Sequence, residues 1–223
     1  MIEWSAISLT LQLAGTTTVV LLCLGTPMAW WLAHARGYRR TLVSALTAMP
    51  LVLPPTVLGF YMLLLLSPKS TLGGLWLNLT GDTLTFSFSG LVLASCVYSL
   101  PFMVQPLQSA FETLGRAPLE AAATLRASPL DRFFSIAVPQ CRRGFLTATV
   151  LTFAHTVGEF GVVLMVGGNI PERTRVISIA IYEHVETLNY AQAHTLSALL
   201  LVFSFVVLIV TYSGQRHAPL RIV

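Results

Sequence analysis

The strongest constraint on this chain is a set of hydrophobic stretches that are each long enough to cross a lipid bilayer. A membrane-spanning helix needs about 20 mostly apolar residues, so a chain of 223 residues has room for five or six such helices with modest loops. Hydrophobic residues make up 55% of the chain, charged residues 10%, and the mean hydropathy is +0.75, which a soluble domain does not reach. We therefore expect an all-α, polytopic membrane helical bundle that forms a single transmembrane domain over residues 1–223. The predicted spans are Ile7–Leu32, Leu42–Leu66, Phe86–Leu107, Phe145–Val166 and Leu196–Tyr212.

A sixth apolar segment, Ser67–Thr85, is interrupted too often to be counted as a span. Three glycines, an asparagine and an aspartate divide it. We expect it to lie at the outer interface, which gives five spans, with six as the alternative.

The distribution of basic residues predicts the orientation of the chain in the membrane. Cytoplasmic loops are enriched in lysine and arginine. With the predicted spans, ten arginines fall on one side, from the Arg36–Arg40 cluster to Arg216 and Arg221, and Lys69, Arg173 and Arg175 fall on the other. This places the N-terminus outside and the C-terminus inside. Because Glu3 precedes the first span and the basic cluster follows it, that span is predicted to be a retained helix and not a signal peptide.

The loop at about residues 112–143 is the longest predicted on the inner side. Pro118 and Glu120 suit the first turn of one short helix, and Ser128 followed by Pro129 suits the start of a second. Two short helices would form a compact knob. Physical reasoning alone leaves two roles open: the loop packs along its own membrane surface, or it docks to a partner.

The chain shows no pattern typical of an enzyme. The only lysine, Lys69, follows a proline, so no phosphate-binding G-x-x-x-x-G-K-[ST] loop is present. The five histidines and three cysteines have no spacing typical of a metal or redox site, and each is interpreted as a structural residue. We expect no catalytic residue, no metal and no cofactor; any ATP hydrolysis would belong to a partner. The net charge of +4 is explained by topology, so no nucleic-acid partner is expected.

The inner loop resembles the EAA loop of bacterial ABC importer permeases. The matching residues are Glu120-Ala121-Ala122, Leu125, Ala127, Ile136 and Pro139. The resemblance implies a cytoplasmic coupling helix that docks in a groove of an ATP-binding subunit. This sequence departs from the pattern where the family usually has glycine, so Arg126 must either adopt a strained turn or reshape the break between the helices. The residues implied in coupling are Glu120, Ala121, Ala122, Leu125, Arg126, Ala127 and Ser128.

Two further stretches are similar to the molybdate and sulfate branch of these permeases. Residues 50–60 (PLVLPPTVLGF) resemble its second-span signature, and Gly158–Gly161 with residues 169–175 (NIPERTR) resemble the signature of the molybdate members. The likeness extends from about Leu9 to Tyr212. It implies import of molybdate, with sulfate or tungstate as the alternative.

The same stretches contain the candidate gate. Pro50, Pro54 and Pro55 predict a kinked or locally unwound second span, and such breaks are tolerated in a membrane where they line a pathway, with a packing kink as the alternative. Glu159 is the only acidic residue inside a predicted span, where it costs roughly 2.5–3.5 kcal/mol. We expect it to hold the neighbouring glycine backbone in a bend through hydrogen bonds; the alternative is a carboxylate that reaches water. The candidate gate residues are Pro54, Pro55, Gly158, Glu159, Phe160 and Gly161.

The outer loop offers a weaker candidate site. Arg173 and Arg175, beside acidic residues, suit the docking of an extracytoplasmic binding protein, although a solvated loop fits as well. The implied partners are a second copy of the chain, two ATPase subunits, a molybdate-binding protein and the lipid of a bacterial inner membrane. The rivals from other classes are a self-sufficient secondary anion transporter or channel, which would need repeats or several intramembrane charges, and a membrane enzyme.

Overall fold

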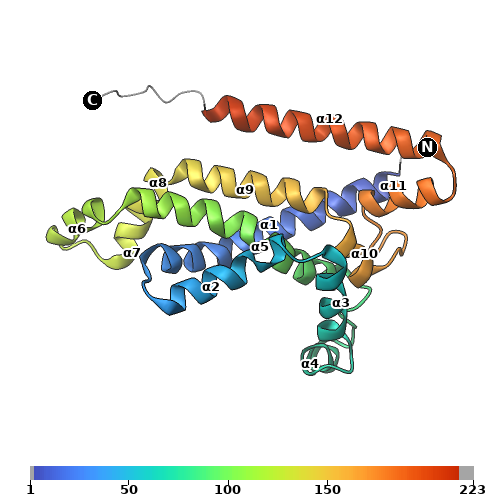
Figure 1. Ribbon diagram of the computed structural model, residues 1–223, viewed down its shortest axis with the longest axis horizontal. Helices are drawn as coiled ribbons and strands as arrows, with labels where there is room; N and C mark the ends of the chain where they lie inside the picture. The colour runs from blue at the N-terminus through green and yellow to red at the C-terminus, as the bar shows by residue number, and fades with distance from the viewer. Residues whose placement is uncertain (1–2, 216–223) are drawn as a thin grey trace.

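A computed structural model describes residues 3–215, and the described part of the chain contains helices and loops but no strand (Figure 1). The core is built from three helices: α1 (Trp4–His34), α5 (Phe88–Leu114) and α9 (Arg142–Val157). The most extensive helix contacts join α1 to α5 and α5 to α9. α1 and α5 each contain an apolar stretch long enough to cross a membrane, which suits burial on one face and lipid on the other. The predicted first and third spans are therefore present as α1 and α5.

The second predicted span is broken, as its prolines indicate. It consists of α2 (Tyr38–Ala48), a 3-10 turn (Met49–Leu51) and α3 (Pro55–Leu66), and α2 and α3 are bent by 109°. Pro54 caps α3 and Pro55 is its first residue, where the missing N–H costs no helical hydrogen bond. The prediction of a kinked span is confirmed. As a result α3 projects away from the bundle and carries α4 (Thr71–Thr80) at its tip (Figure 1).

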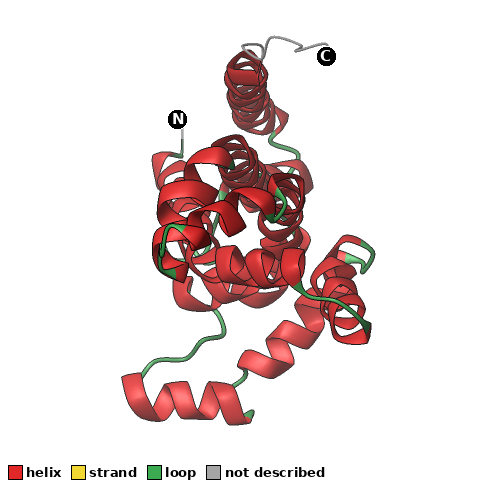
Figure 2. Cartoon of the chain, turned by 90° about the vertical axis from the view of Figure 1, so that its left-hand side faces the viewer, coloured by secondary structure: helices red, strands yellow, loops and turns green. Residues whose placement is uncertain are grey.

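The fourth predicted span is also broken. α9 ends at Val157, and α10 (Gly161–Gly167) continues after a 60° bend. α10 packs against α3 and α5, so the two bent pairs meet. α11 (Ile177–Glu186) then leads into α12 (Tyr190–Gln215), which packs mainly against α11 and runs along the outside of the bundle (Figures 1 and 2).

Three described helices are long and apolar enough to cross a membrane, and the number rises to five if each bent pair is one span. The three are α1, α5 and the Tyr190–Ile209 part of α12. The number of spans and the orientation of the chain remain predictions. Two of the arginines used for the orientation, Arg216 and Arg221, lie outside the described residues.

Candidate coupling surface and gate

The predicted coupling loop forms two short helices at one end of the bundle. They are α6 (Ala117–Thr124) and α7 (Pro129–Arg132), which continues through a π-helical stretch (Phe133–Ala137) into α8 (Val138–Gln140). Glu120 lies in the first turn of α6, and the Ser128 hydroxyl accepts a hydrogen bond from the Asp131 N–H at 3.2 Å, as expected for an N-cap. The predicted pair of helices is confirmed.

Arg126 adopts the strained turn, which was one of the two outcomes expected for it. Its φ is +65°, in the left-handed region that favours glycine. The Arg126 N–H donates to the Ala123 carbonyl at 3.0 Å, and the Ala127 N–H donates to the Ala122 carbonyl at 3.1 Å. This is the hydrogen-bond pattern of a Schellman motif, with Arg126 at the position where glycine is commonest.

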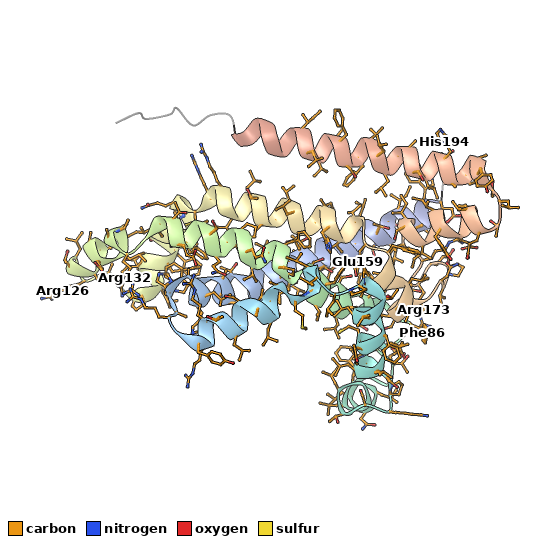
Figure 3. The ribbon with its side chains drawn as sticks, in the orientation of Figure 1. Phe86, Arg126, Arg132, Glu159, Arg173 and His194 are labelled. Atoms are coloured by element: carbon orange, nitrogen blue, oxygen red, sulfur yellow. The ribbon has the colours of Figure 1, made fainter. Side chains whose placement is uncertain are left out.

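The knob formed by these helices presents apolar side chains to its surroundings. Leu125 is 84% exposed, Leu130 71% and Phe134 64%. Figure 3 shows Arg126 at the far tip of this end of the molecule. Three large exposed apolar side chains close together on a short polar segment are typical of a protein contact surface.

An aromatic cluster connects the knob to the core. The Phe133 ring contacts Trp30 of α1 edge-to-face at 5.1 Å between centroids, and Trp30 contacts Phe111 of α5 at 5.0 Å. Phe111 in turn contacts Phe145 of α9. The coupling segment and the three core helices thus meet at one aromatic cluster, in which Phe111 is buried and the other three rings are partly buried.

The candidate gate lies around a cavity of about 560 Å³ where α3, α5 and the α9–α10 break meet. Five of the six predicted gate residues line it, and the sixth, Pro54, instead caps α3 beside it. Figure 3 shows Glu159 in the interior of the bundle, close to the break. The lining residues among those predicted are Pro55, Gly158, Glu159, Phe160 and Gly161.

Two glycines allow the bent pairs to cross closely. A Cβ on Gly161 would lie 2.8 Å from Pro55 Cβ, and a Cβ on Gly59 would lie 2.7 Å from Met165 Cβ, both closer than side-chain packing permits. Gly59 belongs to the second-span signature at residues 50–60. Gly161 belongs to the Gly158–Gly161 stretch, which resembles the signature of the molybdate members. Each glycine therefore lies at a separate close approach between α3 and α10, Gly161 against Pro55 and Gly59 against Met165.

Glu159 does not hold the bend in the way that we expected. Its side chain is buried, and neither carboxylate oxygen meets a partner in hydrogen-bonding geometry among the described residues; the Ser95 hydroxyl of α5 is likewise buried without a hydrogen bond. The bend is instead fixed through the main chain, because the Ser178 hydroxyl of α11 donates to the Glu159 carbonyl at 2.6 Å. The alternative of a carboxylate that reaches water is not observed either, since Glu159 is only 3% exposed.

Four residues of this cavity were not predicted from the sequence: Thr56, Tyr98, Ala154 and His155. His155 was interpreted as a scattered structural histidine. In the fold it hydrogen-bonds to the Ser99 hydroxyl at 2.9 Å and stacks on Phe102 at 4.0 Å between ring centroids. The available signal was its position four residues before Glu159, which is typical of side chains on one helix face.

The two outer-loop arginines differ in their surroundings. Arg175 forms ion pairs with Glu3 at 3.2 Å and Glu183 at 3.0 Å, and its side chain is only 16% exposed. His184 also contacts Glu3, at 2.8 Å. Arg175 therefore ties the start of α1 to the outer loop and α11, whereas Arg173 is exposed (Figure 3).

Comparison with known proteins gives a consistent family. Residues 25–221 match the profile described as "Binding-protein-dependent transport system inner membrane component". The chain is 58% identical over 214 residues to the molybdenum transport system permease protein ModB of Azotobacter vinelandii, covering 96% of this chain and 95% of that protein. It is 35% identical over 185 residues to ModB of Escherichia coli K12 (83% and 81%) and 31% identical over 199 residues to the sulfate permease CysT of the same strain (89% and 72%).

Solved structures support the fold. The MetNI methionine ABC transporter in an inward-facing conformation matches with a TM-score of 0.74 at 16% identity, covering 96% of this chain and 95% of that chain. A bacterial alginate ABC transporter in complex with its periplasmic protein matches with a TM-score of 0.75, also at 16% identity, covering 95% and 77%. This chain belongs to the family of binding-protein-dependent transport system inner membrane components, which are multi-pass proteins of the bacterial inner membrane.

Proposed function

We propose that this chain is the permease subunit of an ATP-driven ABC importer that carries molybdate into the bacterial cell. Molybdate is favoured over sulfate because the identity to ModB of Azotobacter vinelandii is 58%, whereas that to the sulfate permease is 31%. Tungstate has the same charge and tetrahedral shape, so it remains the alternative within this function.

The main observation behind the proposal is the knob of exposed apolar side chains, which is joined to the core by the aromatic cluster around Trp30 and Phe133. Leu125, Leu130 and Phe134 suit a groove on a separate ATPase, and Phe133 connects that contact to the helices of the core. In the proposed orientation this end of the bundle is cytoplasmic. ATP binding and hydrolysis in two ATPase subunits would move the two knobs of a symmetric pair of permeases.

The proposed movement at the gate is a change in the contact between the two bent pairs. α3 and α10 meet through Gly59 and Gly161, and the cavity beside them is lined by Glu159 and His155. An extracytoplasmic binding protein would deliver the oxyanion to the outer face, where Arg173 is free of ion pairs among the described residues. Arg175 would act by holding the outer loop in place.

Co-purification tests the proposal. The tagged chain, extracted from native membranes in mild detergent, is expected to carry one ATPase subunit per permease. Leu125→Asp should remove most of that subunit, because it puts a charge into an apolar contact. Leu79→Asp, at another highly exposed leucine on α4, should leave the ratio unchanged. A chain that purifies alone and moves an anion without ATP would favour the secondary transporter.

A further inference from the structure

A second cavity, of about 310 Å³, lies at the end of the bundle that carries the coupling loop. It is formed where α1 runs into α2 and where α5 runs into α6, two junctions far apart in the sequence. Its charged lining consists of Arg36, Arg40 and Arg116 with one carboxylate, Glu112. Because a water molecule occupies about 30 Å³ in the liquid, the cavity has room for a phosphate-sized group and several waters.

The charges in this cavity are not balanced from within. Glu112 is bound by Arg40 at 2.5 Å and by the Gln108 amide at 2.9 Å. Arg36 and Arg116 are exposed and form no ion pair within residues 3–215. Two arginines thus line a concave site in which the one carboxylate, Glu112, is paired with Arg40 and not with them.

The rest of the lining also favours an anion. α6 begins at Ala117, directly after Arg116, so the positive end of the helix dipole adjoins the cavity. Guanidinium groups match phosphate oxygens in a bidentate arrangement.

The surface around the cavity has the character of a membrane interface. Trp31 and Tyr38, 44% and 78% exposed, flank the α1–α2 junction, and α2 presents Leu42 and Leu46 on its exposed face. Tryptophan and tyrosine concentrate at the level of the lipid headgroups. Basic pockets between helices at this level bind acidic lipid headgroups.

We propose that this pocket binds a phosphate group, supplied either by the headgroup of an acidic phospholipid or by a free oxyanion. Arg36 and Arg116 bind the oxygens of the phosphate. Arg40, which is paired with Glu112, keeps its place in the lining of the cavity. The site lies next to α6, so its occupancy steadies the base of the coupling segment. The cytoplasmic position of the pocket rests on the proposed orientation of the chain; the binding itself does not.

The test uses the complete transporter, reconstituted in phosphatidylcholine nanodiscs with and without phosphatidylglycerol. Bound phosphatidylglycerol is counted by native mass spectrometry after release in mild detergent, and its affinity is titrated. The transporter with both Arg36→Gln and Arg116→Gln should bind phosphatidylglycerol roughly 30-fold more weakly. Each arginine near an anionic headgroup is expected to strengthen binding about fivefold, and the two effects multiply. Neither side chain has an ion pair to lose, so the variant should fold.

Two controls complete the test. Arg39→Gln removes an exposed arginine of α2 that does not line the cavity. It should leave the affinity for phosphatidylglycerol within about twofold of the wild type, which is a smaller change than the loss of one arginine–headgroup contact would cause. Inorganic phosphate is titrated in phosphatidylcholine alone: arginine-dependent phosphate binding without phosphatidylglycerol binding would assign the site to a free oxyanion. Equal loss from Arg39→Gln, or no loss from the double variant with either probe, would overturn the proposal.

Discussion

Arg126 occupies a position whose left-handed backbone conformation favours glycine. A left-handed backbone costs a non-glycine residue about 1–2 kcal/mol, and Arg126 has no hydrogen bond from its side chain within the described residues to offset this. We expect Arg126→Gly to stabilise the coupling segment by about 1 kcal/mol. The measurement is the melting temperature of the purified complex together with its affinity for the ATPase subunit.

Arg126→Ala is the matched control for that substitution, because it removes the side chain but keeps the strain. If alanine stabilises as much as glycine, the side chain and not the backbone is the source of the cost. A weaker ATPase contact in both variants would instead assign Arg126 a direct role in docking.

Glu159 carries a second prediction at this scale. Burying a charged carboxylate without a hydrogen-bond partner destabilises the folded state. A side chain that cannot ionise should therefore make the fold more stable. Glu159→Gln is expected to raise the melting temperature of the complex by a few degrees. A lower melting temperature would mean that the carboxylate has a partner outside this chain, such as the second copy.

The contact between the bent pairs is the element on which the proposed gate depends. Gly161→Ala and Gly59→Ala each place a Cβ within 2.8 Å of a carbon on the facing helix, so each should cost about 1–3 kcal/mol of stability and reduce transport. Gly15→Ala in α1, where a Cβ meets nothing within 4 Å, is the matched control; it should leave transport unchanged and raise stability by about 0.5–1 kcal/mol, because alanine is the better helix former. Thermal unfolding and uptake measure the two effects; full activity in Gly161→Ala would show that α3 and α10 separate freely.

Local chemistry explains which of these elements could be predicted from the sequence. The prolines at 50, 54 and 55 predict a break, since proline cannot donate in the helix ladder, and the cap at Ser128 predicts the start of α7. The 109° angle could not be predicted, because it depends on α10 as well as α3. The same limit explains His155 and Arg175, whose partners come from distant segments of the chain.

At the scale of the whole molecule, we propose that one copy of the chain forms half of the transport pathway. The candidate gate cavity is lined by one copy each of α3, α5, α9 and α10, and α12 leaves Leu201 and Phe205 exposed on the outside of the bundle. A second copy related by a two-fold axis would complete the pathway. Cross-linking between copies in native membranes should therefore give a dimer and no larger species.

The most direct test of ATP-driven import is uptake by vesicles that contain the permease, its ATPase subunit and trapped ATP. With the binding protein outside, an ATP-driven molybdate importer should accumulate molybdate only when ATP is present inside, and Leu125→Asp should abolish accumulation while leaving the permease folded. Accumulation without ATP, or accumulation that Leu125→Asp does not change, would contradict the proposed coupling.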